Sequence, residues 1–286
     1  MVAIISNSAL CNPLTKEENK VPPVVSCSWL ADNISNPGLV ILHVAPVRLD
    51  YDNGHIPGAR FLWPGYITIS TEKETTVPAP AKDVEKLLRS LGVNNNSHVV
   101  LCGIYGNIIP VSRIFVNLEH FGLKGRVSIL DGGFEAWKAA GLKISTEVPD
   151  IKKGKFATNV ENNLVDGEFV SGNLTNKSYC LIDARPKPQY DGTTGTPRPG
   201  HIPGAKNLPQ IELYDSKTFI FIDSEKIIQA FKKLGIPEGC RPVFYCHSGN
   251  QASVGYVAAI VAGYDPLLYD GSLEEWGSRS DLPIEK

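Results

Sequence analysis

The sequence has little of what marks several large classes of protein. Six cysteines in 286 residues are too few for a disulfide scaffold, and no CxxC pair or Cys/His cluster at zinc spacing occurs. No stretch approaches the roughly 20 apolar residues that a membrane-spanning helix needs. The net charge is −2 without a long run of one sign, so nucleic-acid or polybasic membrane binding has no electrostatic basis. These absences predict a soluble globular protein with no metal, no nucleic-acid partner and no membrane partner.

The first 21 residues carry no strong structural or targeting signal. They lack the basic n-region and the small-residue cleavage site of a secretory signal peptide. We expect a polar leader at 1–21 and a cytoplasmic location. A periplasmic location is the alternative if a signal peptide has been removed.

The chain contains an internal repeat. GHIPGA occurs at 54–59 and again at 200–205, VVLCG (99–103) is matched by VFYCH (243–247), and DGGFEAW (131–137) is matched by DGSLEEW (270–276). The order of the segments is kept and only the loop lengths differ, which indicates a duplication. We predict an N-terminal domain at 22–142, a polar linker at 143–163 and a C-terminal domain at 164–286.

Each repeat alternates strand and helix signals. In the second copy, 178–184 is a short apolar run typical of a buried strand, and 223–235 shows helical spacing with a polar cap before it and a glycine after it. A second strand at 242–246 is followed by an apolar helix at 252–263. Alternation of this kind predicts an α/β fold, with a mainly parallel sheet flanked by helices in each domain.

Cys246 is the residue best placed for chemistry. It ends a predicted strand, and a short loop separates it from a helix that we expect to begin near Ala252. Ligands of open parallel sheets bind beyond the carboxyl ends of the strands. Inward-turned amides and the positive end of a helix dipole stabilise a thiolate, so we expect the pKa of Cys246 to be lowered. The predicted binding loop consists of His247, Ser248, Gly249, Asn250, Gln251 and Ala252.

The other cysteines offer less. Cys180 lies inside a predicted strand and is expected in the core, whereas Cys11, Cys27 and Cys240 lie in loops or at element edges without a recognisable role. Cys102 occupies the place of Cys246 in the first repeat. Its loop differs, so a second active thiol and a vestigial buried thiol both stay open.

The repeated GHIPGA, the paired DG-x-x-x-x-W and the strand–Cys246–loop–helix segment resemble the tandem-domain rhodanese family of thiosulfate and 3-mercaptopyruvate sulfurtransferases. The resemblance covers residues 22–280. It implies that Cys246 carries a transferable sulfur as a persulfide, received from a small donor and passed to cyanide or a thiol. A thioredoxin-like reductant is a further expected partner. The resemblance also implies a catalytically silent N-terminal domain and no cofactor, although that domain commonly lacks a cysteine where this chain has Cys102.

The donor is harder to choose. The loop CHSGNQ matches neither the CRKGVT of thiosulfate enzymes nor the CGSGVT of mercaptopyruvate enzymes, although Ser248 is shared with the second. Arg198 matches one of two arginines that clamp the mercaptopyruvate carboxylate, but Asp191 stands where the other is expected. Because CxxGxQAS resembles a bacterial thiosulfate branch, we predict thiosulfate as donor, with 3-mercaptopyruvate as the alternative. Arg185 has two open interpretations, donor-anion binding and a structural salt bridge.

The first GHIPGA segment supplies a further candidate. In the mercaptopyruvate enzymes the equivalent of His55 lies near the cysteine across the domain interface. We therefore predict His55, with Asp52 as a weaker companion, as a cross-domain contributor to the site.

Two other classes of function fit the sequence less well. A phosphatase of the same fold needs Cys-x5-Arg, and here the sixth residue after Cys246 is Ala252, which cannot grip phosphate. A non-catalytic module that binds sulfide or senses redox state through Cys246 is the second alternative, and a persulfide trapped on Cys246 would separate it from the enzyme.

Overall fold

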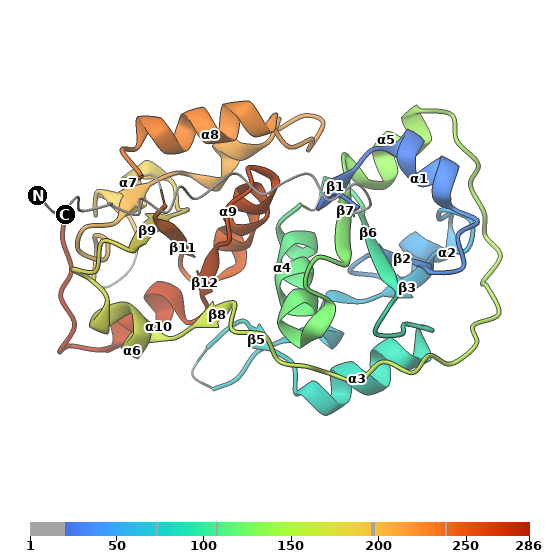
Figure 1. The fold of residues 1–286 in the computed structure, drawn as a ribbon, viewed down its shortest axis with the longest axis horizontal. Coiled ribbons are helices and arrows are strands. Elements are labelled where there is room, and N and C mark those ends of the chain that lie inside the picture. The colour runs from blue at the N-terminus through green and yellow to red at the C-terminus, as the bar shows by residue number, and fades with distance from the viewer. Residues whose placement is uncertain (1–20, 73, 107, 196–197, 238) are drawn as a thin grey trace, which may run out of the picture.

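The chain folds into two domains that lie side by side (Figure 1). The structure is a computed structural model that describes residues 21–72, 74–106, 108–195, 198–237 and 239–286. Apart from Val21, the predicted leader lies outside the described residues.

The N-terminal domain is built on a five-stranded parallel sheet. Its strands, in spatial order, are β1 (Val24–Val25), β7 (Val127–Leu130), β6 (His98–Gly103), β2 (Leu39–Val44) and β3 (Arg60–Leu62). Its α-helices are α1 (Cys27–Asn33), α2 (Arg48–Asp52), α3 (Ala81–Ser90), α4 (Ile108–Leu118) and α5 (Gly133–Ala139). A two-stranded hairpin of β4 (Thr68–Ile69) and β5 (Val77–Pro78) projects toward the other domain (Figure 1).

The C-terminal domain repeats this design. Its parallel sheet has the spatial order β10 (Lys206–Asn207), β9 (Tyr179–Asp183), β11 (Arg241–Tyr245), β12 (Leu267–Tyr269) and β8 (Leu164–Val165). Its α-helices are α6 (Gly167–Gly172), α7 (Lys187–Tyr190), α8 (Ser224–Lys233), α9 (Asn250–Val261) and α10 (Ser272–Ser278). Strand for strand, this sheet corresponds to the first one, which confirms the predicted duplication and the predicted fold class.

The two domains share one continuous core. Helices α4 and α9 pack against each other between the sheets (Figure 1), and a single hydrophobic cluster includes buried residues from both. Helix α9 is apolar around its whole circumference because β11 covers one side and α4 the other. A buried hydrogen-bond chain also crosses the interface, since Asn163 donates to the Tyr256 hydroxyl (3.2 Å), which in turn donates to the Glu119 carboxylate (2.9 Å).

The linker is bound along the outside of the N-terminal domain. It passes α3 before it enters β8 (Figure 1). Backbone hydrogen bonds tie Gly154 to Arg89 and Phe156 to Val93, and the Phe156 side chain is fully buried. The linker 143–163 is polar in composition but contains one apolar anchor, Phe156. Its burial contributes about 2 kcal/mol to the free energy of unfolding if the whole side chain leaves water.

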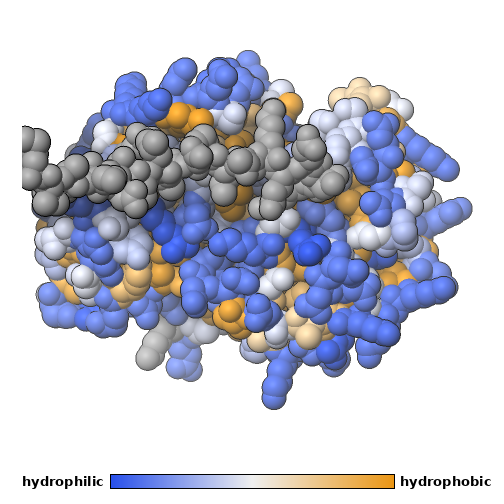
Figure 2. All heavy atoms as spheres, viewed as in Figure 1, coloured by the Kyte–Doolittle hydropathy of each residue, from blue (hydrophilic) through white to orange (hydrophobic). Residues whose placement is uncertain are grey.

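Most of the face in Figure 2 is hydrophilic, and its hydrophobic residues form only small groups. None of the helices in the described part of the chain is both long enough and apolar enough to span a bilayer.

The sequence interpretation of two cysteines was wrong. Cys180 at the start of β9 and Cys240 just before β11 form a disulfide, with their Cα atoms 6.0 Å apart. The two residues are separated by 60 positions and meet because β9 and β11 are neighbours in the sheet. No local sequence motif therefore predicts the bond.

Closing a loop of this length restricts the unfolded chain strongly. We expect Cys180→Ser/Cys240→Ser to lower the free energy of unfolding by about 3–4 kcal/mol, measured by urea denaturation without reductant. Wild-type protein reduced with dithiothreitol is the control and should approach the double variant. Equal stability of the oxidised wild type and the double variant would contradict the bond.

Candidate active site

Cys246 directly follows the last residue of β11 and is 1% exposed. The next residues form a loop that curls around its sulfur and leads into α9. Helix α9 begins at Asn250, two residues earlier than predicted, because Gly249 adopts a left-handed conformation (φ +80°) and serves as its N-cap. The catalytic candidate therefore lies at the carboxyl edge of the sheet and at the amino end of a twelve-residue helix.

Burial and backbone N–H groups act on the thiol in opposite directions. Burial raises the pKa of Cys246, and hydrogen bonding by the amides of Ala252, Ser248 and Gln251 lowers it. Burial is the larger effect, so that the pKa of Cys246 is raised above its ordinary value, with the Asp183 charge adding to the rise. The predicted amide cradle is present, but the predicted net lowering of the pKa is wrong, because the dry site penalises the thiolate more than the amides stabilise it.

The loop is held from its outer side by the segment after β12. The Cys246 amide donates to the Ser272 hydroxyl (3.2 Å), and the Cys246 carbonyl accepts from Leu273 (3.2 Å). The His247 carbonyl accepts from the Glu274 amide (2.8 Å). The His247 side chain is exposed to solvent. These bonds fix the backbone of the loop while its inner amides stay directed at sulfur.

Arg185 forms a buried ion pair with Asp183 at the end of β9. Its Nε and Nη2 atoms lie 3.0 Å and 2.6 Å from the two carboxylate oxygens, and Nη2 also donates to the Gly200 carbonyl (2.8 Å). Both side chains are 2% exposed or less. Of the two interpretations of Arg185, these contacts favour the structural salt bridge.

Arg198 contacts the C-terminal segment of the chain. Its guanidinium donates to backbone carbonyls near the C-terminus, those of Trp276 (3.4 Å), Arg279 and Leu282 (2.6 Å). Asp191 pairs with Lys187 on the surface (2.8 Å). The two positions expected to clamp a donor carboxylate therefore bind elsewhere in the C-terminal domain.

His55 and Asp52 also make their contacts inside their own domain. The ring nitrogens of His55 lie 2.8 Å from the Tyr51 carbonyl and 3.1 Å from the Glu147 carbonyl, and the ring stacks on Tyr51. Asp52 pairs with Arg48 (2.9 Å) at the surface. The contacts of these residues do not reach Cys246, so their predicted cross-domain role has no geometric support.

Other residues cross the interface at the loop, and sequence reasoning missed them. The Thr76 hydroxyl donates to the Ser248 carbonyl, and the Thr75 amide donates to the Glu274 carboxylate (2.8 Å). Arg113, in the first turns of α4, forms an ion pair with Asp270 and donates to the Thr76 carbonyl (3.3 Å). Charged residues in an otherwise apolar helix, such as Arg113, were the available signal.

Cys102 lacks the surroundings of Cys246. It lies one residue before the end of β6, where it is fully buried and pairs in register with His43. Burial raises the pKa of Cys102 well above its ordinary value, and the charges of Glu135 and Cys27 raise it further. Of the two interpretations that the sequence left open, these contacts favour the buried vestigial thiol.

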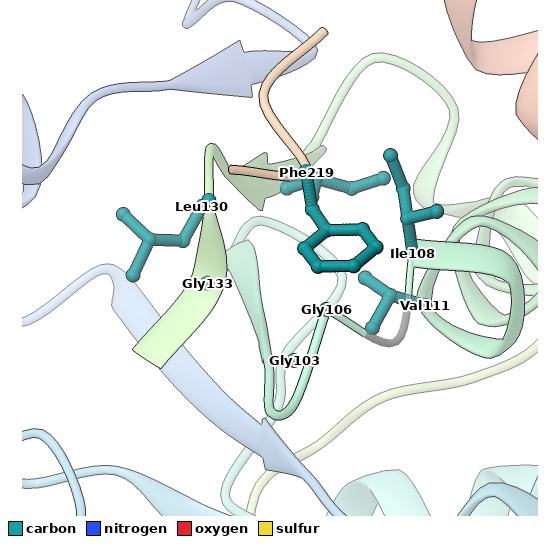
Figure 3. A pocket seen from close by; sticks show the side chains of 9 residues that line it. Gly103, Gly106, Ile108, Val111, Leu130, Gly133 and Phe219 are labelled. Atoms are coloured by element: carbon teal, nitrogen blue, oxygen red, sulfur yellow. The ribbon is translucent and has the colours of Figure 1, made fainter. Parts of the chain in front are cut away.

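The loop after Cys102 is covered by the other domain. Phe219 projects from the C-terminal domain into a small pocket of the N-terminal domain, over Gly106 and beside Ile108 and Val111 (Figure 3). Phe219 has a left-handed backbone (φ +56°), supported by a hydrogen bond to the Asp215 carbonyl (2.7 Å). An aromatic ring of the C-terminal domain thus packs over the loop that follows Cys102.

Comparison with known proteins agrees with this geometry. The Rhodanese-like domain family matches residues 26–140 and 167–279, once in each half of the chain. The chain belongs to this family. The two matched segments fall within the two rhodanese-like domains predicted from the repeat.

Curated relatives match over nearly their whole length. The 3-mercaptopyruvate sulfurtransferase of Escherichia coli K12 is 31% identical, over 91% of this chain and 97% of its own. The sulfur carrier protein TtuD of Thermus thermophilus is 28% identical (92% and 96%), and the thiosulfate sulfurtransferase of Azotobacter vinelandii is 27% identical (93% and 97%).

Solved structures share the architecture. SseA from Escherichia coli, described as a 3-mercaptopyruvate sulfotransferase with the rhodanese fold, superposes with a TM-score of 0.76 at 27% identity, covering 88% of this chain and 99% of its own. An anaerobic ergothioneine biosynthesis enzyme from Chlorobium limicola reaches 0.80 at 22% identity, covering 92% and 70%. The second likeness concerns the fold alone.

Among the described residues, no group of three or more His, Cys, Asp or Glu side chains is arranged to hold a metal ion. The site offers a buried thiol, an amide cradle and a helix N-terminus.

The loop geometry can be tested with two glycines at the ends of the same helix. Gly249 and Gly263 have nearly the same left-handed backbone (φ +80° and +84°), but a Cβ on Gly249 would lie 2.9 Å from Arg113 Nη1 and from the Asp270 carbonyl, whereas a Cβ on Gly263 meets nothing within 4 Å. Alanine costs about 1–2 kcal/mol of backbone strain at either position. We expect only Gly249→Ala to displace the cradle and to lower sulfurtransferase activity, roughly 100-fold.

His247→Ala is the companion variant, measured by the pH dependence of Cys246 alkylation with iodoacetamide. Since the His247 side chain is exposed and its backbone carbonyl makes the contact, we expect the alkylation pKa to stay at the wild-type value. A clear upward shift in His247→Ala, together with normal activity of Gly249→Ala, would show that a Cys–His pair generates the thiolate.

Proposed function

We propose that the protein is a thiosulfate sulfurtransferase that carries a sulfane sulfur as a persulfide on Cys246. The acceptor is cyanide or a thiol, with a thioredoxin-like reductant as the candidate protein thiol. Sulfurtransferase chemistry in general is supported by the family and by relatives named for thiosulfate and for 3-mercaptopyruvate. Thiosulfate as the donor is our further proposal.

In the first half-reaction, the Cys246 thiolate attacks the outer sulfur of thiosulfate. A bond forms between the cysteine sulfur and this outer sulfur, the bond to the sulfonate sulfur breaks, and sulfite leaves with the electron pair. In the second half-reaction, cyanide or a thiolate attacks the terminal sulfur of the persulfide. The sulfur–sulfur bond then breaks and returns its electron pair to Cys246 as thiolate.

The observation that carries the proposal is the set of three amides directed at one buried sulfur. Before the transfer, the amides of Ser248, Gln251 and Ala252 donate to the Cys246 sulfur, where the negative charge resides. After the transfer, the negative charge lies on the terminal sulfur of the persulfide. Fixed donors in a dry site stabilise such charge without reorganising at the moment of reaction. A core cysteine without a reaction partner has no need of three inward N–H groups.

The choice of thiosulfate rests on Arg198 and Asp191. The first is bound to backbone carbonyls of the C-terminal segment and the second to Lys187, so the carboxylate clamp expected of mercaptopyruvate enzymes is not assembled. Thiosulfate has no carboxylate and does not need this clamp. 3-Mercaptopyruvate is the second candidate, favoured by the name of the Escherichia coli relative.

The nucleophile is tested with Cys246→Ser. A serine hydroxyl is barely ionised and cannot carry sulfur, so we expect sulfur transfer to be abolished while circular dichroism stays at the wild-type spectrum. Intact-mass spectrometry after thiosulfate treatment should show one added sulfur atom on the wild type and none on the variant. Cys102→Ser is the matched control and should behave as the wild type. Turnover by Cys246→Ser would reject the assignment.

The donor is tested with Arg198→Ala. Because its guanidinium donates hydrogen bonds to backbone carbonyls, we expect the free energy of unfolding to fall by about 1–3 kcal/mol. We expect KM for thiosulfate and for 3-mercaptopyruvate to stay unchanged. Thermal unfolding and steady-state kinetics with both donors measure this. A selective rise of KM for 3-mercaptopyruvate would instead support the second candidate.

A further inference from the structure

The wall beside the catalytic loop is rich in carboxylates. The Asp270 carboxylate lies 3.5 Å from where a Cβ on Gly249 would be, and the Glu74 carboxylate of the N-terminal hairpin lies 2.9 Å from the same point on Gly271, across the interface. Glu275 lies beside the same point on Gly271, and Glu274 accepts from the Thr75 amide next to Glu74 (2.8 Å). Burial raises the pKa of Glu74, and the charges of Asp270, Glu275 and Glu274 raise it further. A thiolate and an anionic donor must therefore meet next to negative charge.

The loop itself has no lysine or arginine to offset these charges. Its cationic candidate, His247, is exposed, and the Arg185 guanidinium is directed to Asp183 and to the Gly200 carbonyl. Asp183 also contributes a negative charge that raises the pKa of Cys246. Any compensating charge has to come from outside the loop.

Arg113 places a guanidinium beside the catalytic loop, next to Gly249 and Asp270. It is 1% exposed, its Nη2 atom pairs with Asp270, and its Nη1 atom lies 2.9 Å from where a side chain on Gly249 would begin. Its Nε and Nη1 atoms have no hydrogen-bond partner within the described protein. Burying a guanidinium in this state is costly, so a hydrophobic residue would stabilise the interface better unless the charge has a function.

We propose that Arg113 of the N-terminal domain is a positioning residue for the anionic sulfur donor: it balances the acidic wall formed by Asp270, Glu74, Glu274 and Glu275 and holds Asp270 against the catalytic loop. The catalytically silent domain would then supply the positive charge that the loop lacks. This inference rests on the proposed function only in naming the donor as a sulfur oxyanion, because the charge balance acts on any anion that approaches Cys246.

The test compares two reagents that attack the same thiolate. Iodoacetamide is neutral and iodoacetate is an anion, so the ratio of their rates at Cys246 cancels the thiolate fraction and reports the local potential. We expect Arg113→Met to lower the iodoacetate-to-iodoacetamide rate ratio by roughly tenfold at low salt, with the effect shrinking as salt is added. Peptide mapping assigns the alkylation to Cys246.

Two further variants separate charge from structure. Arg113→Met/Asp270→Asn removes both charges and should return the ratio to the wild-type value, and Arg113→Lys should keep it there. Arg241→Met is the matched control, because Arg241 pairs with Asp265 (2.7 Å) at the amino end of β11, opposite to Cys246, and should leave the ratio unchanged.

If Arg113→Met does not fold, Asp270→Asn alone decides. It keeps the guanidinium and removes one negative charge, so the ratio should rise. An unchanged rate ratio in both Arg113→Met and Asp270→Asn would overturn the proposal. If Arg113→Met cannot be prepared, an unchanged rate ratio in Asp270→Asn would overturn it. No sulfur donor is used in this assay, so its result is independent of persulfide formation. Failure of the proposed function would appear separately, as the absence of a thiosulfate-derived sulfur on Cys246.

Discussion

The packing of α4 against α9 is the constraint on which the site depends. Helix α9 starts at the catalytic loop, and its buried surface is divided between its own sheet and the helix of the other domain. Without α4, an almost wholly apolar helix would face water, and the amino end that orients the amides at Cys246 would lose its support. The proposed active site therefore depends on both domains, although the sulfur and its cradle come from one of them.

The duplicated loops have diverged through what the opposite domain places over them. At the C-terminal copy, the Thr76 hydroxyl of the hairpin segment donates to the Ser248 carbonyl, and the Thr76 carbonyl accepts from Arg113, which pairs with Asp270. At the N-terminal copy, Phe219 lies over Gly106 and lines the pocket there (Figure 3). The opposite domain thus supports the loop at Cys246 through hydrogen bonds and covers the loop after Cys102 with an aromatic ring, which agrees with the proposal that Cys246 carries the sulfur.

Opposing electrostatic effects meet at Cys246. Burial raises the pKa of the thiol and three amides lower it, with burial the larger effect. A dry site weakens thiolate formation but strengthens every fixed dipole and charge that acts on the reacting sulfur. In this setting the balance between Arg113 and the carboxylates around it controls which anions can approach.

The sequence by itself determined the features that are local or repeated. The duplication predicted both sheets and their helices, and the strand–cysteine–glycine–helix order predicted the amide cradle, because backbone geometry follows from a few consecutive residues. It could not determine the Cys180–Cys240 disulfide or the partners of Arg185, Arg198 and His55, because these contacts join segments far apart in the chain. Only the tertiary structure decided that burial outweighs the amides at Cys246 and that Arg113, rather than His55, reaches the loop. Burial and cross-domain distances arise from packing, which no local pattern records.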